Sequence, residues 1–249
     1  QNVNLYCRGL DPHVDFGDLL IAVNQVQGIR RIRYTTSHPR DFSDHIIEAI
    51  AKSEKVCPHI HLPVQAGSNR ILKMMNRGYT REYYLELVEK IRRAVPGCSL
   101  TTDLIVGFPG ETDDDFAETA DLVQRVRYDN AFTFIYSPRT GTPAATMADQ
   151  VPEEVKQERI QCLMKIQAGV SREINEQLVG RTLELLVEGE SKTNPEILTG
   201  RTVTNKVVNF PGDRSLIGHL VDVKITGAQS WYLVGKRSSD SQPTARSLQ

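Results

Sequence analysis

The sequence lacks a long apolar run, and no segment approaches the roughly 20 consecutive apolar residues that a membrane-spanning helix needs. It also lacks the charged and then apolar opening of a signal peptide. Cysteine is scarce, and the four cysteines lie too far apart for a zinc knuckle, an iron–sulfur run or a secreted disulfide scaffold: Cys7, Cys57, Cys98 and Cys162. We therefore expect free thiols in a cytoplasmic protein that has no membrane partner.

The charge is nearly balanced, with 30 Lys or Arg against 31 Asp or Glu in 249 residues. A hydrophobic content of 39% suits one medium domain and one small domain. The chain opens on Gln1 and enters regular structure without a lead-in, so we expect a fragment that begins within a domain.

The first two thirds alternate between strand and helix patterns, which favours a parallel sheet with helices outside. Helices are expected at 15–26, from a cap at Asp41 or Ser43 to 51, at 68–75, from Thr80, and from 113. Strands are expected at 29–36, 59–64, 99–106 and 131–136. A full (β/α)₈ barrel needs about twice as many strands. The prediction is a partial TIM-like (β/α) barrel over 1–174.

Two helices of this part have clear apolar stripes. The helix that begins at 113 would bury Phe116, Ala120, Val123 and Val126. A long helix follows Pro152, and its expected buried positions are Ile160, Leu163, Ile166, Val170, Ile174 and Leu178.

The chain changes character after Gly180. Short strands are expected at 182–187, 197–200, 206–210, 220–225 and 231–234, with Gly, Pro and Asp turns between them. Five short strands in about 60 residues predict a small all-β barrel that resembles an oligonucleotide-binding fold. We assign it to 175–238 and expect a disordered tail over 239–249.

Polar residues gather where the predicted strands end, which is where a β/α barrel places its reactive groups. The segments are 35–38 (Thr-Thr-Ser-His), 63–65 (Pro-Val-Gln), 101–103 (Thr-Thr-Asp) and 136–139 (Tyr-Ser-Pro-Arg). They supply uncharged hydrogen-bonding groups, one carboxylate and one arginine. Such a set suits a nucleoside, and it contains no Ser/His/Asp triad, no acid–base carboxylate pair and no His-rich metal site.

Two short motifs have competing interpretations. His59 and His61 share one strand face and could chelate zinc, but no third ligand is apparent, so we favour packing across strands. The turn 107–110 (Gly-Phe-Pro-Gly) could cradle a phosphate at a helix start. Three aspartates follow it directly and would repel a phosphate, so we interpret it as turn geometry.

Residues 201–237 contain six Lys or Arg and two Asp, a net charge of +4. Such an excess is typical of a nucleic-acid surface, and equally of a solvated rim around a small barrel. The six are Arg201, Lys206, Arg214, Lys224, Lys236 and Arg237.

Several motifs together resemble the radical S-adenosylmethionine (SAM) methylthiotransferases, most closely the MiaB type that acts on tRNA. They are 1–4 (Gln-Asn-Val-Asn), 35–39 (Thr-Thr-Ser-His-Pro), 61–68 (His-Leu-Pro-Val-Gln-Ala-Gly-Ser), 103–112 (Asp-Leu-Ile-Val-Gly-Phe-Pro-Gly-Glu-Thr) and 132–139 (Phe-Thr-Phe-Ile-Tyr-Ser-Pro-Arg). The region after Gly180 resembles the TRAM domain of the same family. The resemblance extends from the first residue to about Arg237.

The resemblance implies a transferase that adds a methylthio group to C2 of isopentenyl-adenosine, 3′ of the tRNA anticodon. It implies SAM and two [4Fe-4S] clusters as cofactors and the tRNA anticodon stem-loop as partner; we expect a monomer. The cluster-binding cysteine trios of the family are not in this sequence. The fragment itself is therefore expected to bind no cluster, to hold no metal and to contribute no catalytic residue.

The resemblance also implies roles for residues at matching positions. Asn2, Asn4, Ser37, Gln65 and Asp103 would bind the cofactor, and Tyr136 and Arg139 would meet the target adenosine or its phosphate. The residues expected to contact RNA in the second domain are Arg201, Asn205, Lys206, Arg214, Lys236 and Arg237.

Other functions remain open from the sequence. The TRAM-like barrel could act as a stand-alone tRNA-binding module. The target could instead be threonylcarbamoyl-adenosine or a ribosomal protein, as in related methylthiotransferases. An aldolase-like barrel enzyme is a weaker alternative, because no suitable lysine or metal site lies at the strand ends.

Overall fold

The computed structural model describes residues 2–7, 10, 14–35, 37–192, 194 and 196–237. Packing divides the chain into two units, Gln1–Gln167 and Ala168–Gln249, and the division falls inside helix α6 (Glu153–Glu176). The expected domain boundary after 174 stays a prediction. The expected tail at 239–249 lies outside the described residues.

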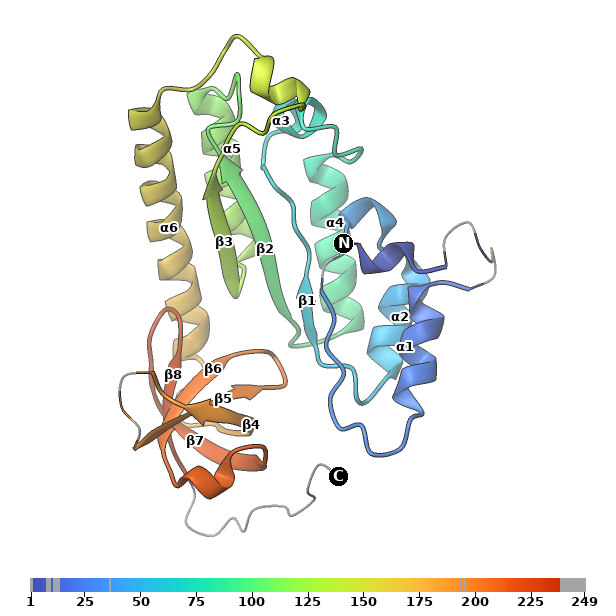
Figure 1. Ribbon diagram of the computed structural model, residues 1–249, viewed down its shortest axis with the longest axis vertical. Coiled ribbons are helices and arrows are strands. Elements are labelled where there is room, and N and C mark those ends of the chain that lie inside the picture. Colours follow the sequence, from blue (N-terminus) through green and yellow to red (C-terminus); the bar gives the residue numbers. More distant parts are fainter. Residues whose placement is uncertain are drawn as a thin grey trace. The chain divides into compact units, whose positions relative to one another are not determined.

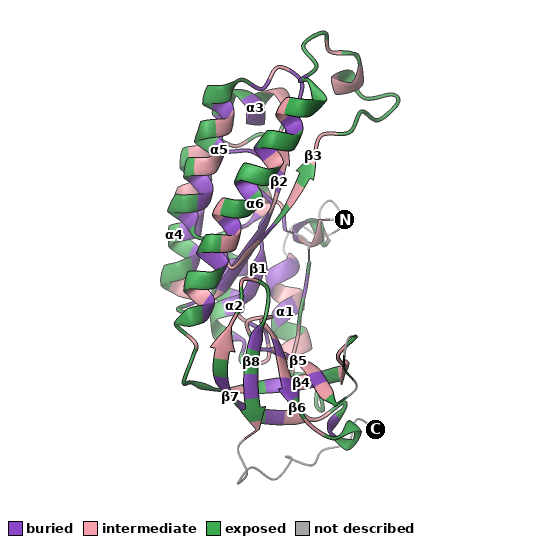
Figure 2. Ribbon diagram, turned by 90° about the vertical axis from the view of Figure 1, so that its left-hand side faces the viewer, coloured by how far each residue is buried: buried purple, intermediate pink, exposed green. Residues whose placement is uncertain are grey.

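A parallel three-stranded sheet forms the centre of the first unit (Figure 1). Its strands are β1 (His59–His61), β2 (Ser99–Val106) and β3 (Asn130–Ile135), in the order β1-β2-β3. Helices α4 (Arg81–Ala94) and α5 (Asp113–Val126) and the first half of α6 lie against one face of this sheet (Figure 2). Parallel strands covered by helices on one face confirm the predicted partial (β/α) arrangement.

The two faces of the sheet differ in chemistry because strand side chains alternate. Toward the helices, β2 presents Leu100, Thr102, Leu104 and Val106, all of which are buried. On the opposite face, the part of the chain that the structure describes places no helix over β2 and β3 (Figure 2). On that face Phe132 and Phe134 of β3 are each about half exposed, at 50% and 51%.

The predicted caps Ser43 and Thr80 are confirmed, and the other helices of the unit begin close to their expected starts. Asp15 caps α1 (Phe16–Asn24), Ser43 caps α2 (Asp44–Lys52) and Thr80 caps α4, each by accepting a backbone N–H. Ser68 occupies the cap position of α3 (Asn69–Met74). Three 3₁₀ turns complete the unit: η1 (Val3–Leu5), η2 (Pro39–Asp41) and η3 (Pro143–Thr146).

The predicted strand at 29–36 is wrong over its described residues. Only Ile32 forms a bridge, a parallel one to Val56, through an Ile32 N–H···Lys55 O bond of 2.7 Å and a Cys57 N–H···Ile32 O bond of 2.9 Å. Tyr34 packs edge-on against Phe16 of α1, with ring centroids 5.2 Å apart. The alternating pattern therefore reflects side chains held by a helix and not by a strand ladder.

The predicted stripes of α5 and α6 need correction. On α5 the buried positions are Asp115, Thr119, Leu122, Val123 and Val126, whereas Phe116 and Ala120 are only partly buried. On α6 Leu163 and Val170 are buried as expected, but polar residues share that face: Lys156, Arg159, Gln167, Ser171 and Asn175. Loop backbone beneath the helix needs hydrogen-bond partners, and apolar periodicity cannot reveal that need.

The second unit contains a closed five-stranded barrel of order β4-β5-β6-β8-β7, as predicted. The strands are β4 (Thr182–Glu190), β5 (Ile197–Thr202), β6 (Val207–Pro211), β7 (Leu220–Ala228) and β8 (Leu233–Arg237), with η4 (Arg214–Leu216) between β6 and β7. Its core is apolar and separate from that of the first unit, with Leu185, Leu198, Val208, Phe210 and Val223 inaccessible to solvent.

Candidate functional site

Four polar residues from two distant segments meet near the carboxyl ends of the strands. The Asn2 side-chain oxygen accepts the backbone N–H of His38 at 3.3 Å, and Asn4 Nδ2 donates to His38 O at 3.5 Å. The N–H of Ser37 donates to the backbone oxygen of His61, the last residue of β1, at 3.3 Å. Asn2, Asn4 and Ser37, predicted as cofactor contacts, are therefore brought to one place.

Gln65 and Asp103 lie on neighbouring chain segments of the same sheet edge. The N–H of Gln65 donates to Asp103 O at 2.9 Å, and Gln65 adopts a left-handed backbone conformation with φ of 75°. The Asp103 side chain is 28% exposed, and its Oδ1 lies 3.5 Å from Nε2 of His61. The five predicted cofactor residues thus gather around the carboxyl end of β1 and the middle of β2.

His59 and His61 connect this edge to the middle of the sheet, and among the described residues they belong to no group with metal-ligand spacing. Thr101 Oγ1 lies 2.9 Å from His61 Nδ1 and 3.3 Å from His59 Nε2. His61 also contacts the Phe132 ring edge-on at 5.9 Å. Packing across strands, the favoured interpretation, is what the structure shows.

No sequence motif pointed to Arg77, which supplies a cation at the same edge. Arg77 follows a left-handed Asn76 that ends α3, and its N–H donates to Leu72 O at 3.0 Å. Burial lowers the pKa of Arg77, while Tyr79 and Asp103 oppose this shift. Its Nε is buried without a partner among the described residues. Arg77 thus lies within electrostatic reach of both Asp103 and His38.

Tyr136 and Arg139 differ in their accessibility. Tyr136 follows β3 and packs edge-on against Phe108, with ring centroids 5.2 Å apart; its hydroxyl is buried without a partner in the described chain. Arg139 is exposed in the loop that follows. The structure places Tyr136 at the strand-end edge and leaves Arg139 open to solvent.

The residues at this edge fit a polar ligand. Asn4 Oδ1, Ser37 Oγ and the Tyr136 hydroxyl are buried and, within the described part of the chain, have no hydrogen-bond partner. Unsatisfied buried polar atoms are costly, so a ligand that offers hydroxyl, amino or carboxylate groups would complement them. Ribose, an amino acid head group and a base edge all offer such groups.

The cysteines do not fit an iron–sulfur cluster. All four are free thiols. Among the described residues, the one group of His, Cys, Asp or Glu with metal-ligand spacing contains no cysteine. A cluster needs several thiolates within reach of one cube, so nothing in the described chain could ligate it.

The turn at 107–110 has a structural role, as interpreted from the sequence. The Gly107 N–H donates to Glu111 Oε1 at 2.9 Å, and Arg159 Nη1 of α6 donates to the same oxygen at 2.8 Å. Gly107 has a φ of 71°, and a Cβ there would lie 2.4 Å from Lys156 Cγ. Burial raises the pKa of Glu111, although the Gly107 N–H and Arg159 oppose the shift.

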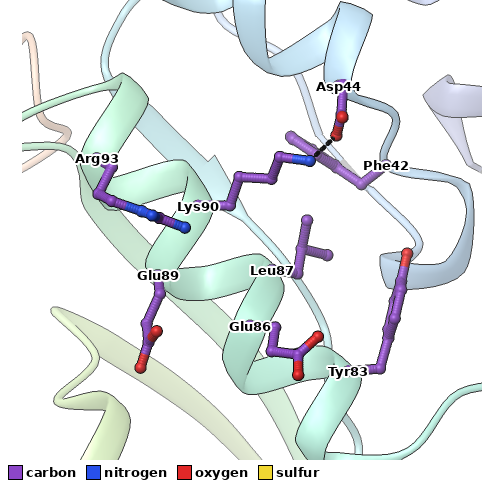
Figure 3. A pocket seen from close by; sticks show the side chains of 8 residues that line it. All are labelled: Phe42, Asp44, Tyr83, Glu86, Leu87, Glu89, Lys90 and Arg93. Atoms are coloured by element: carbon purple, nitrogen blue, oxygen red, sulfur yellow. Dashed lines mark hydrogen bonds and ion pairs between the residues drawn. The ribbon is translucent and has the colours of Figure 1, made fainter.

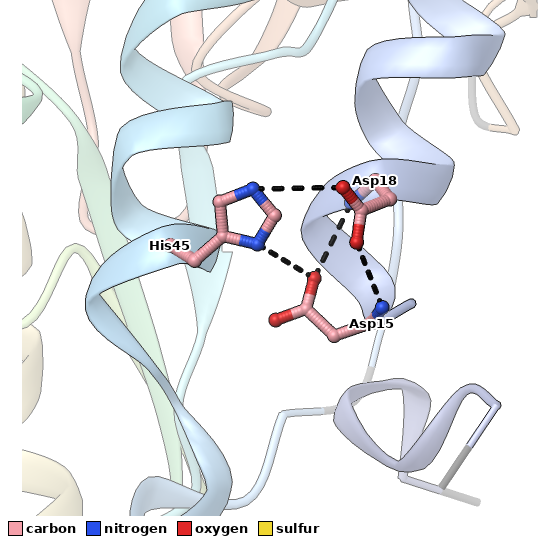
Figure 4. A group of neighbouring side chains, drawn as sticks. All are labelled: Asp15, Asp18 and His45. Atoms are coloured by element: carbon pink, nitrogen blue, oxygen red, sulfur yellow. Dashed lines mark hydrogen bonds and ion pairs between the residues drawn. The ribbon is translucent and has the colours of Figure 1, made fainter. Parts of the chain in front are cut away.

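The metal-spaced group consists of Asp15, Asp18 and His45 (Figure 4). Its carboxylates already have partners, because Asp15 and Asp18 form the capping box of α1. His45 Nδ1 lies 2.9 Å from Asp15 Oδ1, and Nε2 lies 3.7 Å from Asp18 Oδ1. The arrangement joins the starts of α1 and α2, and we interpret it as a helix-to-helix contact.

A cavity of about 390 Å³ lies between α4 and the start of α2 (Figure 3). It is lined by Phe42, Tyr83 and Leu87 together with charged residues, and an ion pair between Lys90 and Asp44 crosses it. None of the predicted site residues lines it.

In the barrel, the predicted basic strip is largely balanced by acids outside the 201–237 window. Arg201 Nε lies 3.0 Å from Glu188 Oε2, and Arg214 Nε lies 2.8 Å from Glu190 Oε1. Over 182–237 there are seven Lys or Arg and six Asp or Glu, a net charge of +1. Asn205 Oδ1 accepts a 3.3 Å hydrogen bond from Arg201, and Lys206 and Arg237 also have partners within the chain. Lys236 is exposed.

Comparison with protein families now defines the class. Residues 9–123 match the Radical SAM superfamily, and residues 176–236 match the TRAM domain. The chain therefore contains a radical SAM region followed by a TRAM domain. This superfamily uses SAM with an iron–sulfur cluster.

Within this class the chain is closely similar to curated enzymes named tRNA-2-methylthio-N(6)-dimethylallyladenosine synthase. The one from Moorella thermoacetica is 60% identical over 95% of this chain and 53% of that protein. Those from Acetivibrio thermocellus and Syntrophomonas wolfei are each 57% identical, over 94% and 95% of this chain and 49% and 53% of those proteins. The chain spans about half the length of these relatives.

A structural comparison finds coproporphyrinogen III oxidase (HemN) from Escherichia coli, described as a radical SAM enzyme. It is 16% identical with a TM-score of 0.45, over 76% of this chain and 45% of that one.

None of the described helices is long and apolar enough to cross a membrane.

Proposed function

We propose that this chain is part of a tRNA methylthiotransferase that adds a methylthio group to C2 of isopentenyl-adenosine beside the anticodon. The observation that carries the proposal is the 60% identity over 95% of the chain to an enzyme named for this product. The radical SAM and TRAM matches occur in the corresponding order along the chain. The proposed cofactors of the complete protein are SAM and two [4Fe-4S] clusters, and the proposed partner is the tRNA anticodon stem-loop.

In this proposal the strand-end edge of the sheet holds SAM, whose role is to supply the methyl group and the radical. Asn4 Oδ1 and Ser37 Oγ are the buried acceptors for its amino or hydroxyl groups. Asp103 would accept from a ribose hydroxyl or an ammonium group, since His61 holds its carboxylate at the edge. Asn2 and Gln65 would fix the backbone around them.

Tyr136 and Arg139 are proposed to meet the target adenosine. The buried Tyr136 hydroxyl would donate to a base nitrogen, and Arg139 would pair with the adjacent phosphate from its exposed loop. In the barrel, Arg201, Asn205, Lys206, Arg214, Lys236 and Arg237 stay predictions for RNA contact. The ion pairs of Arg201 and Arg214 would have to open or be shared.

A graft into a relative tests the proposal with this chain itself. Its 236 aligned residues replace the matching region of the Moorella thermoacetica enzyme, and the chimera is expressed in a host that lacks its own methylthiotransferase. We expect 2-methylthio-isopentenyl-adenosine in tRNA hydrolysates analysed by mass spectrometry. Asp103→Asn should lower its rate of formation at least about tenfold, since charged hydrogen bonds contribute about 1.5–3 kcal/mol. Asp149→Asn, at an exposed position, is the matched control.

The same nucleoside analysis separates the other functions. A methylthio group on threonylcarbamoyl-adenosine, or a mass increase on a ribosomal protein, would identify a related transferase and overturn the proposed substrate. A folded chimera that yields no modified product would favour a stand-alone tRNA-binding module.

A further inference from the structure

The β7–β8 hairpin of the barrel exposes aromatic residues at its tip. Trp231 is 51% exposed and Tyr232 is 40% exposed, and Val234 follows them on the outer surface at 38%. Val234 and Lys236 alternate with the buried Leu233 and Gly235, so they share the exposed face of β8, and the exposed Tyr232 directly precedes the strand. Neither aromatic ring stacks on another ring among the described residues.

The backbone of this tip is held in place from below. Asn175 of α6 is 3% exposed, and its Nδ2 donates to Gln229 O at 2.7 Å and to Ser230 O at 3.2 Å. The Gln229 N–H donates to Tyr232 O at 2.9 Å and closes the turn. A tip anchored by a buried side chain presents its rings with little conformational entropy left to lose on binding.

Two lysines stand directly opposite each other on the same hairpin. Lys224 of β7 pairs in register with Lys236 of β8, and both side chains are exposed. Like charges in a cross-strand pair are destabilising. Neither ammonium group has a carboxylate partner within the described residues, in contrast to Arg201 and Arg214. A bound anion would relieve this repulsion.

We propose that Lys224, Trp231, Tyr232, Val234 and Lys236 form a binding platform for unpaired RNA nucleotides, and we call this set the hairpin platform. The lysines bind phosphates, and the two rings stack on bases that are not in a duplex. Aromatic stacking next to a basic strip is how proteins bind single-stranded nucleic acid. This inference rests on the proposed function for its RNA partner, and it places loop nucleotides, not the duplex stem, on the barrel.

The neighbouring strand limits where the RNA can pass. Glu184 of β4 pairs in register with Asp222 of β7, two residues from Lys224 on the same exposed side. These carboxylates repel phosphate, so the bound strand runs from the lysine pair toward the hairpin tip and not across β4.

Trp231 is the only tryptophan in the sequence, so its fluorescence reports on this platform alone. The full 249-residue chain is titrated with a 12-nucleotide unpaired oligoribonucleotide, with a 12-base-pair RNA duplex and with heparin. We expect saturable quenching by the unpaired strand, and little quenching by the duplex or by heparin, which has no bases. Equal quenching by strand and duplex would overturn the proposal. A blue shift on vesicles of phosphatidylserine and phosphatidylcholine, without quenching by RNA, would indicate a membrane surface and would also overturn it.

Variants separate stacking from charge, with affinity measured by the anisotropy of a labelled strand. Trp231→Leu and Tyr232→Leu should each weaken binding about tenfold, and Trp231→Phe should restore most of it. Lys224→Gln and Lys236→Gln should each reduce the slope of log affinity against log salt by about 0.7. Lys165→Gln, an exposed change on α6, is the matched control. Unaltered affinity in folded Trp231→Leu and Tyr232→Leu proteins would refute the stacking role.

This inference and the proposed function fail in distinguishable ways. If the chimera forms the methylthio nucleoside while hairpin variants bind RNA normally, only the platform is wrong. If the chimera forms no such nucleoside while the oligonucleotide still quenches Trp231, the platform stands and the assigned reaction falls.

Discussion

Neighbouring residues of β2 have opposite tasks because they point to opposite faces of the sheet. Thr102 is inaccessible to solvent on the helix side, where its hydroxyl accepts the Val64 N–H at 2.9 Å and donates to Leu62 O at 3.0 Å. It thereby supports the chain just after β1 ends at His61. Thr101 and Asp103 face the helix-free side with His61. The polar residues inside the predicted strand thus include both a structural residue, Thr102, and candidate site residues.

His38 provides a pH-dependent test at the same edge. Burial lowers the pKa of His38 below its usual 6.5; Asp41 opposes this shift, and Arg40 and Arg77 reinforce it. The unfolded chain therefore takes up a proton near pH 6.5, while the folded chain takes it up only at lower pH. Stability from this group is complete above about pH 6.5 and is lost as the pH falls below that value.

Nuclear magnetic resonance titration should give a His38 midpoint below 6.5. Urea unfolding at pH 7.5 and pH 5 should show a larger loss of stability in the unaltered chain than in His38→Gln. A midpoint above 6.5 would mean that Asp41, 3.9 Å from the ring, dominates instead.

At the scale of elements, the turn after β2 is fastened to α6 by one buried ion pair. The side chains of Glu111 and Arg159 are 1% and 7% exposed, and Arg159 also lies 5.8 Å from the centre of the Phe116 ring. The same arginine pairs with Asp113, whose side chain is 97% exposed, at 2.7 Å. One guanidinium thus has a buried partner and an exposed partner.

Removing each partner should have unequal effects. Glu111→Ala leaves Arg159 and the Gly107 N–H without their buried acceptor, and it should lower the free energy of unfolding by about 3 kcal/mol. Asp113→Ala, the matched control, should cost under about 1 kcal/mol because water screens the exposed pair. Urea titrations followed by circular dichroism measure both. Equal losses would show that the buried pair adds no more than the exposed one.

Periodicity and capping predicted most helices, the sheet strands and the five barrel strands, because each depends on local sequence. The alternation of apolar and polar residues at 29–36 has another cause, because Tyr34 packs on Phe16 of α1. The buried polar residues of α6 serve backbone groups far away in sequence, as Asn175 serves the loop at Gln229. Arg77 lies at the strand-end edge because of the turn after α3, and no sequence motif predicts that turn.

The charge pattern of the barrel surface likewise could not be predicted from a local stretch of sequence. A window of 201–237 suggested a basic strip, but Glu188 and Glu190 come from β4 and pair with Arg201 and Arg214. The direct pairing of Lys224 with Lys236 follows from strand register and could not be found from net charge.

At the scale of the whole molecule, the chain joins a radical SAM unit to a TRAM barrel, each with its own core. It spans about half the length of relatives named for one tRNA modification. Its cysteines lie too far apart to hold a cluster, whereas its strand-end edge has buried polar atoms without a partner among the described residues. We therefore propose that this chain contributes cofactor and RNA contacts and no cluster ligands.

The most direct test is mass spectrometry of tRNA nucleosides from a strain in which the gene encoding this chain is deleted. The account predicts that 2-methylthio-isopentenyl-adenosine disappears, that isopentenyl-adenosine accumulates in its place, and that the intact gene restores the methylthio form. An unchanged amount of 2-methylthio-isopentenyl-adenosine in the deletion strain would contradict it.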